Sequence, residues 1–166
     1  MIEYPENRSS FLVPGFGRFR YSVPVFHRDY TIRLLQQFVT FLARLAGFVK
    51  KNDPESIALE LESAFHNFLG LPRNLVLRLD ADALLHMFSV TAELDADRVV
   101  IAGLLLREEA DLARRLGSPD EAAILDERAY RLIDAGRSGS LSAELQEYLT
   151  ANQSEKESER KESEGL

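Results

Sequence analysis

The chain contains no cysteine, and this absence excludes several kinds of site at once. Without a thiol the protein has no disulfide, no thiolate nucleophile and no cysteine-bound metal. The sequence also lacks a phosphate-binding loop, a nucleophile elbow with its histidine, and a dinucleotide-binding fingerprint. Its lone G-x-G, Gly15-Phe16-Gly17, is too short to carry a function. We therefore expect no catalytic residue, no cofactor, no metal and no enzyme activity.

Secretion and membrane signals are also missing from the sequence. The N-terminal MIEYPENRSSF has acidic residues where a secretory signal carries positive charge, and no continuous apolar region follows them. The most apolar stretch, residues 30–49, is interrupted by two glutamines, one threonine and the arginines Arg33 and Arg44. Burying two arginines in a bilayer costs several kcal/mol. We therefore expect a cytoplasmic protein without a transmembrane segment.

Composition indicates one globular core. A chain of 166 residues has the length of one domain, and its 45% apolar content is ordinary for a folded protein. The 27 acidic and 20 basic residues give a net charge of -7, which argues against broad adhesion to nucleic acid or to anionic lipid.

Helical periodicity begins near residue 29. Apolar residues recur every three or four positions over 29–51, which predicts a helix with a wide apolar face. Asp29 is placed to cap the start of this helix. A second helix is bracketed by Asp53 as the N-cap, Pro54 in the first turn and Gly70 just past the end.

The remaining helices are predicted from similar boundary signals. The related stretches LDADALL and LDADRVV each place an aspartate at a helix start, predicting a third helix over about 80–92 and a fourth over 96–117. Gly117 ends the fourth helix, and Ser118-Pro119-Asp120-Glu121 forms a capping box that begins a fifth over 119–135. Residues 136–140 end that helix, and 141–150 form a short sixth. We thus predict an all-α fold of five to six helices in a compact bundle.

Two stretches resemble known families. RDYTIRLLQQFVTFLARLAGF, residues 28–48, resembles the opening helix of a family of small bacterial proteins of unknown function. EEADLARRLGSPDEAAILDERAYRLI, residues 108–133, is similar to a tetratricopeptide helical hairpin. The hairpin resemblance depends on small residues where the helices cross, namely Ala110, Gly117, Ala122 and Ala129.

The second stretch departs from the tetratricopeptide motif at Ala113 and Asp126, where the repeat has large aromatic or apolar residues. The resemblance therefore implies one antiparallel hairpin near the C-terminal end, and not an array of peptide-binding repeats. Because the family has no assigned activity, the resemblance implies no catalytic residue.

Two groups of side chains have candidate chemistry. Glu62 and His66 lie four residues apart on one helix face, but no second E-x-x-H completes a di-metal site, so we expect a histidine paired with a helix neighbour. Glu108 and Glu109 lie near Asp111 and several arginines, which predicts an ion-paired, solvated helix face. An enzyme or small-ligand site would require Glu62, His66, Glu108 and Glu109 to converge in one cleft.

Residues 1–26 are predicted to form an N-terminal extended arm, residues 27–151 a single helical domain, and residues 152–166 a disordered charged tail. The arm contains GFGRFRY, which is similar to the aromatic core of an RNA-recognition strand. That module needs a four-stranded sheet, which this chain lacks, so we expect no nucleic-acid binding. Two interpretations stay open: an ordered arm docked on the helices, or a dispensable segment that translation from Val25 would omit.

We predict a non-enzymatic helical interaction module, such as an adaptor, scaffold or regulatory subunit, that binds a protein partner or itself through apolar helix surface. The candidate contacts are Phe16, Phe19, Tyr21, Phe38, Phe41 and Phe48. One alternative is the carboxylate and histidine cleft described above. Another is membrane-surface association through the first helix, although its polar face has few cations. A central, buried first helix would explain the same apolar face without any partner.

Overall fold

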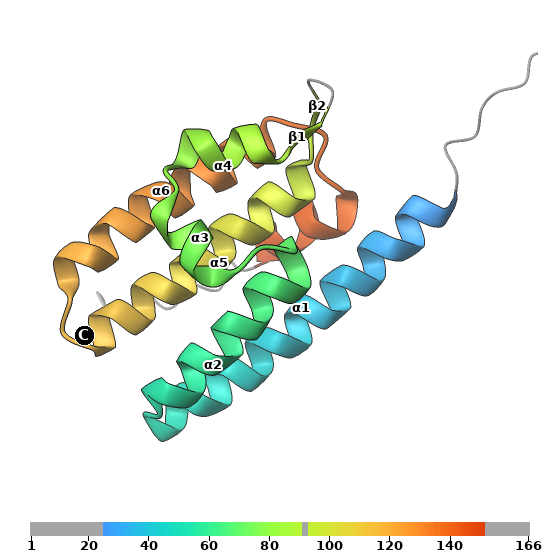
Figure 1. Ribbon diagram of the computed structural model, residues 1–166. Coiled ribbons are helices and arrows are strands. Elements are labelled where there is room, and N and C mark those ends of the chain that lie inside the picture. The colour runs from blue at the N-terminus through green and yellow to red at the C-terminus, as the bar shows by residue number, and fades with distance from the viewer. Residues whose placement is uncertain (1–24, 91–92, 152–166) are drawn as a thin grey trace, which may run out of the picture.

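The computed structural model describes residues 25–90 and 93–151, and the fold over these ranges is all-α (Figure 1). Six labelled helices and a further helical segment over 143–151 make seven α-helical segments in the described part of the chain. The predictions for Phe16, Phe19, Tyr21 and the tail at 152–166 lie outside the described residues.

The first two helices, α1 (Val25–Lys51) and α2 (Pro54–Ala64), run antiparallel to each other along one edge of the bundle (Figure 1). Helix α1 begins at Val25 and has no acidic residue in its first turn, so the prediction that Asp29 caps it is wrong. The residues between Val25 and Asp29 include no proline or glycine. Nothing therefore prevents the helix from starting at Val25, four residues before Asp29. Asn52, with φ of 52°, makes the turn into α2.

The predicted boundaries of the second helix are confirmed. Asp53 accepts hydrogen bonds from the Ser56 backbone N (3.1 Å) and from Ser56 Oγ (2.6 Å), and these bonds lower the pKa of Asp53. Pro54 occupies the first turn. The helix continues as a π-helical turn, η1 (Phe65–Leu69), and ends where Gly70 adopts the left-handed conformation. A π-helical last turn was not predicted.

The predicted helix over 80–92 is too long. The structure has a short helix α3 (Arg73–Arg78), then α4 (Ala81–Met87), capped by Asp80 as expected. Strand β1 (Ser89–Val90) then pairs antiparallel with β2 (Glu93–Leu94). Val90 and the following threonine are β-branched and favour extended backbone over helix. Helix α3 was not predicted from the sequence.

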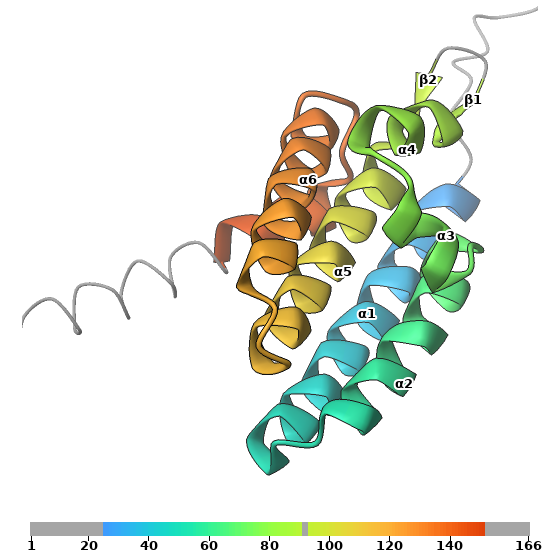
Figure 2. The same ribbon diagram turned by 60° about the vertical axis from the view of Figure 1, so that its left-hand side comes forward.

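Helices α5 (Ala96–Arg115) and α6 (Pro119–Arg137) form an antiparallel hairpin, seen from two sides in Figures 1 and 2. Asp95 caps α5, and Gly117 has the left-handed conformation in the turn, as predicted. Ser118 is the N-cap of α6 but makes no side-chain capping bond, so the predicted capping box is not formed.

Helix α6 ends at Arg137, within the predicted stretch 136–140, and Gly136 lies in its last turn, where the two helices of the hairpin approach closely. A Cβ atom at Gly136 would lie 2.5 Å from Val100 Cγ2 and 3.0 Å from the Ala96 carbonyl oxygen. Gly103 has the same role on α5, since a Cβ there would lie 2.9 Å from the Ala129 carbonyl oxygen. Small residues on both helices thus set the tight α5–α6 packing.

The core between the two helix pairs buries Phe38 and Phe41 of α1 and Phe65 and Phe68 of η1. The Phe38 and Phe68 rings meet edge to face with centroids 5.2 Å apart, and the Phe41 ring lies within 6 Å of both. Phe38 and Phe41 are 0% and 2% exposed. Because buried rings cannot reach a partner while the fold is intact, these two residues are core residues and not the partner contacts that the sequence analysis proposed.

Candidate functional site

Helix α1 is long and apolar, yet only one edge of it is buried. Phe38, Phe41 and Leu45 are the residues of α1 that the structure fully buries among those it describes. The window Ile32–Lys51 has a mean hydropathy of 1.3, and 17% of it is buried. Figure 1 shows why: α1 lies at the margin of the bundle, and its N-terminal end extends past the other helices. An apolar helix therefore keeps accessible surface on both sides of its buried edge.

On one side of that edge lies an apolar stripe. We use this name for six residues of α1: Ile32, Leu35, Val39, Leu42, Ala46 and Val49. Successive members are three, four, three, four and three positions apart, so they line one face of the helix. Val39 is 44% exposed and Ala46 is exposed, while the other four are partly buried, and three of these, Leu35, Leu42 and Val49, also pack against the core. The stripe contains no charged residue along its whole length.

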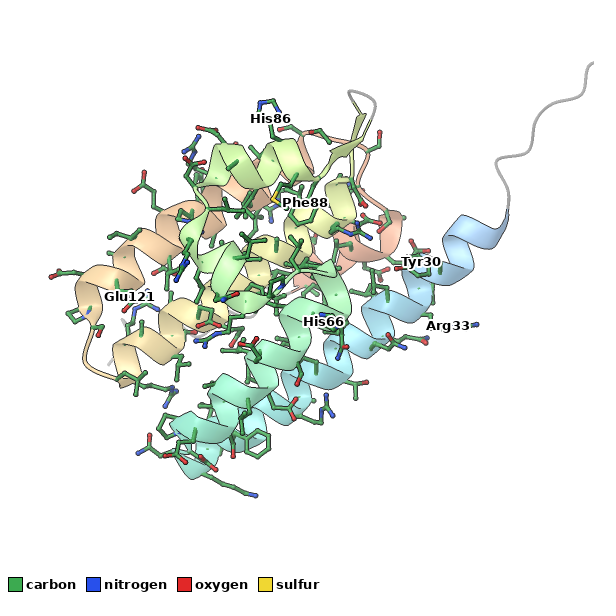
Figure 3. The ribbon with its side chains drawn as sticks, viewed as in Figure 1. Tyr30, Arg33, His66, His86, Phe88 and Glu121 are labelled. Carbon is green, nitrogen blue, oxygen red and sulfur yellow. The ribbon has the colours of Figure 1, made fainter. Side chains whose placement is uncertain are left out.

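On the other side of the buried edge lies an open polar groove between α1 and α2. It has a volume of about 600 Å³. Residues of α1, α2 and η1 line it, and most of them are polar: Arg33, Gln36, Gln37, Thr40, Phe41, Arg44, Glu60, Ser63, Ala64, Asn67 and Phe68. Arg44 Nη2 lies 3.2 Å from Glu60 Oε2 across the groove. Figure 3 shows the Arg33 side chain extending away from the bundle.

Phe48, the third candidate contact on α1, is partly buried against the core. The Lys51 Nζ lies 6.0 Å from the centroid of its ring, at the outer limit of a cation–π contact. Phe48 thus lies at the C-terminal end of α1, partly covered by a lysine. The apolar surface that α1 offers to a partner on this side is the apolar stripe, which periodicity alone did not separate from the wide apolar face.

Glu109 is not on a solvated helix face, and for this residue the prediction is wrong. Its side chain is 3% exposed and accepts two hydrogen bonds from Arg73, with Nε to Oε1 at 2.5 Å and Nη2 to Oε2 at 2.7 Å. The hydrogen bond to Glu109 raises the pKa of Arg73. The physical reason for the error is α3, because this unpredicted helix brings Arg73 against α5. Asp111 does pair with Arg114 at the surface, as expected.

A second arginine holds the other end of α3. Arg128 of α6 donates to the carbonyl oxygens of Val76 (2.7 Å), Leu77 (3.0 Å) and Leu79. These carbonyls belong to the last turn of α3 or directly follow it, where backbone acceptors lack helical partners. Burial lowers the pKa of Arg128. The two arginines Arg73 and Arg128 therefore act as structural groups that fix α3 on the α5–α6 hairpin.

The predicted carboxylate and histidine residues do not form a site of their own. Glu62 and His66 are exposed, and both carboxylate oxygens of Glu109 are bonded to Arg73. None of these residues, nor Glu108, lines the groove beside α1. Over the described ranges 25–90 and 93–151, no group of three histidine, aspartate or glutamate side chains could hold a metal ion.

Comparisons with protein-family models, with curated proteins and with solved structures each found no match to this chain. Within the described residues, α1 is the one helix long and apolar enough to cross a membrane by length and composition. A single helix of this kind is weak evidence for a membrane span, because core helices and signal sequences have the same properties. The geometry of the apolar stripe is therefore the main basis for a functional proposal.

Proposed function

We propose that this protein is a non-enzymatic helical interaction module whose binding surface is the apolar stripe of α1. The observation that supports this proposal most directly is the exposure of Val39 in the middle of an otherwise apolar, uncharged helix face. Single exposed apolar residues are common on proteins, whereas an apolar helix face whose exposed members Val39 and Ala46 lie between partly exposed ones is typical of a contact surface. The rest of the fold supplies a rigid support, since the buried edge of α1 packs on Phe68 of η1.

The helical hairpin is part of the same proposal. We infer that α5 and α6 are similar to one tetratricopeptide hairpin within a small helical protein of the bacterial type that the sequence resembles. In support, Ala110, Ala122 and Ala129 are buried at the helix crossing. Asp126, which departs from the motif, instead forms an ion pair with Arg114 across the hairpin. A single hairpin gives no concave peptide groove, which again favours α1 as the binding surface.

A capture experiment tests the proposal. The tagged full chain is incubated with an extract of the organism that makes it, beside two variants of adjacent residues, Val39→Glu in the stripe and Thr40→Glu outside it. Both side chains are exposed, so neither change should unfold the domain. We expect every specific association of the chain, with itself or with another protein, to be lost with Val39→Glu and kept with Thr40→Glu. Equal effects of the two variants would refute the stripe as the binding surface.

Membrane-surface association is the second candidate, and the low burial of the apolar window Ile32–Lys51 is the observation that favours it. Against it, the polar side of α1 offers few cations to an anionic headgroup, and Arg44 already pairs with Glu60. Flotation of the full chain with vesicles of phosphatidylglycerol and phosphatidylethanolamine distinguishes the two candidates. Val39-dependent flotation would favour the membrane, and its absence would favour a protein partner.

A further inference from the structure

The spacing of the apolar stripe identifies the shape of its occupant. Alternating steps of three and four residues over Ile32 to Val49 are the a and d positions of a heptad repeat. Such a seam receives the side chains of another helix between its own, whereas an extended strand or a flat lipid surface does not require this register. The stripe covers 17 helical rises, which at about 1.5 Å per residue is a contact about 26 Å long. The occupant is therefore an α-helix with a matching seam.

Within residues 25–90 and 93–151, one helix has a matching seam, and it is α1 itself. The other large apolar side chains that are exposed in the described ranges are scattered over different elements, and none belongs to a seam: Tyr30, Leu59, Met87, Leu116, Ile124 and Tyr130. We propose that a second copy of this chain covers the stripe, so that α1 pairs with α1 of its partner. This inference rests on the proposed function and names its partner.

The residue sizes and charges favour an antiparallel pair. When the two stripes are centred between Val39 and Leu42, Ile32 faces Val49 of the second copy, and Leu35 faces Ala46 of that copy. Each pairing of Leu35 with Ala46 places a large residue opposite a small one, which fills the interface evenly. In a parallel pair the two copies of Ala46 would face each other and leave a gap.

Lysines at the end of α1 point to the same orientation. Lys50 and Lys51 form the last turn of the helix, immediately after the stripe. A parallel pair would bring four lysines together, and like charges held side by side destabilise an interface. With the stripes centred between Val39 and Leu42, an antiparallel pair places the two lysine clusters about 20 helical rises apart, which is about 30 Å. The borders of the stripe do not oppose this arrangement, because Gln36 and Ala43 are uncharged.

Cysteine cross-linking tests both the partner and the orientation. Since the chain has no cysteine, each variant Ile32→Cys, Val49→Cys and Thr40→Cys has a single thiol. We expect a short bismaleimide to join an equimolar mixture of Ile32→Cys and Val49→Cys into a covalent dimer. The same reagent should join neither variant with itself, and should not join Thr40→Cys. Efficient cross-linking of Ile32→Cys alone would overturn the antiparallel orientation.

The result for self-association is separable from the result for the proposed function. If no mixture cross-links, and the wild-type chain stays at the monomer mass of 18.8 kDa up to millimolar concentration, the second copy is the wrong occupant. Capture of a different protein that is lost with Val39→Glu would then leave the interaction module standing with another partner. Loss of both cross-linking and capture would refute the stripe as a binding surface altogether. Vesicle flotation that depends on Val39 would overturn the second copy in favour of a membrane.

Discussion

Glu109 offers the most demanding test of the structure, because sequence reasoning placed it at the surface and the structure buries it. We consider the change Glu109→Gln, which keeps the shape of the side chain and removes its charge. Removing one partner of a buried ion pair costs about 3–5 kcal/mol. Arg73 is 25% exposed and recovers some contact with water, so we expect the lower end, about 3 kcal/mol. For a chain of this size that corresponds to a fall of about 6–12 °C in Tm.

Urea unfolding followed by circular dichroism at 222 nm measures this cost. The matched control is Asp111→Asn, two residues along the same helix, where both partners of the ion pair are well exposed and the loss should be about 0–1 kcal/mol. Replacing both partners, with Arg73→Met and Glu109→Leu, should restore most of the stability, because an apolar pair of similar volume has no charge to desolvate. A loss below about 1 kcal/mol for Glu109→Gln would refute the buried pairing of α3 with α5.

Two further predictions concern the hairpin and the start of α2. Ala129→Leu should overpack the α5–α6 crossing and lower the free energy of unfolding by about 1–3 kcal/mol. Ala123→Leu, on the exposed side of the same helix, should lower it much less. Equal losses in urea unfolding would mean that α6 has a different register. At Asp53, hydrogen bonds from Ser56 lower the pKa of the carboxyl group in the folded state. The contribution of Asp53 to stability is therefore complete above its unfolded pKa of about 3.9, and it is lost as the pH falls through the lower folded pKa. Asp53→Asn should reduce the dependence of Tm on pH in that acidic range, and an unchanged dependence would argue against the cap.

Much of the helix layout could be predicted because its signals are local. Asp53, Asp80 and Asp95 each cap the helix that follows them, and Gly70 and Gly117 adopt the left-handed conformation at helix ends. These contacts join residues within a few positions of one another, so residue type and spacing are enough to predict them.

The missing helix α3 and the misplaced Glu109 have a common cause in contacts between distant segments. Helix α3 is only six residues long and is held by two long-range contacts. Arg73 binds Glu109, which is 36 positions away, and Arg128 binds carbonyl oxygens of α3 about 50 positions away. A helix this short is not stable by propensity alone, and α3, unlike α4 with its cap Asp80, has no side-chain cap that could predict it.

The candidate site was predicted only in outline for a similar reason. Periodicity indicated that α1 has a broad apolar face, but it could not show which part of that face the bundle covers. Phe38 and Phe41 were the obvious contacts because they are large and aromatic, yet they pack on Phe68 from another element. The smaller residue Val39 is the exposed one. Dividing the face into core and surface requires the position of α2 and η1, which the sequence alone did not provide.

The central claim is that the apolar stripe of α1 joins this chain to a second copy of itself, and sedimentation equilibrium tests it most directly. The full chain, Val39→Glu and Thr40→Glu are each measured over concentrations from about 1 μM to 1 mM, the range where interfaces of this modest size associate. We predict that the wild-type chain and Thr40→Glu rise from 18.8 kDa toward twice that mass, while Val39→Glu stays at the monomer mass. A wild-type chain that remains a monomer throughout, or a dimer that Val39→Glu leaves intact, would contradict the account.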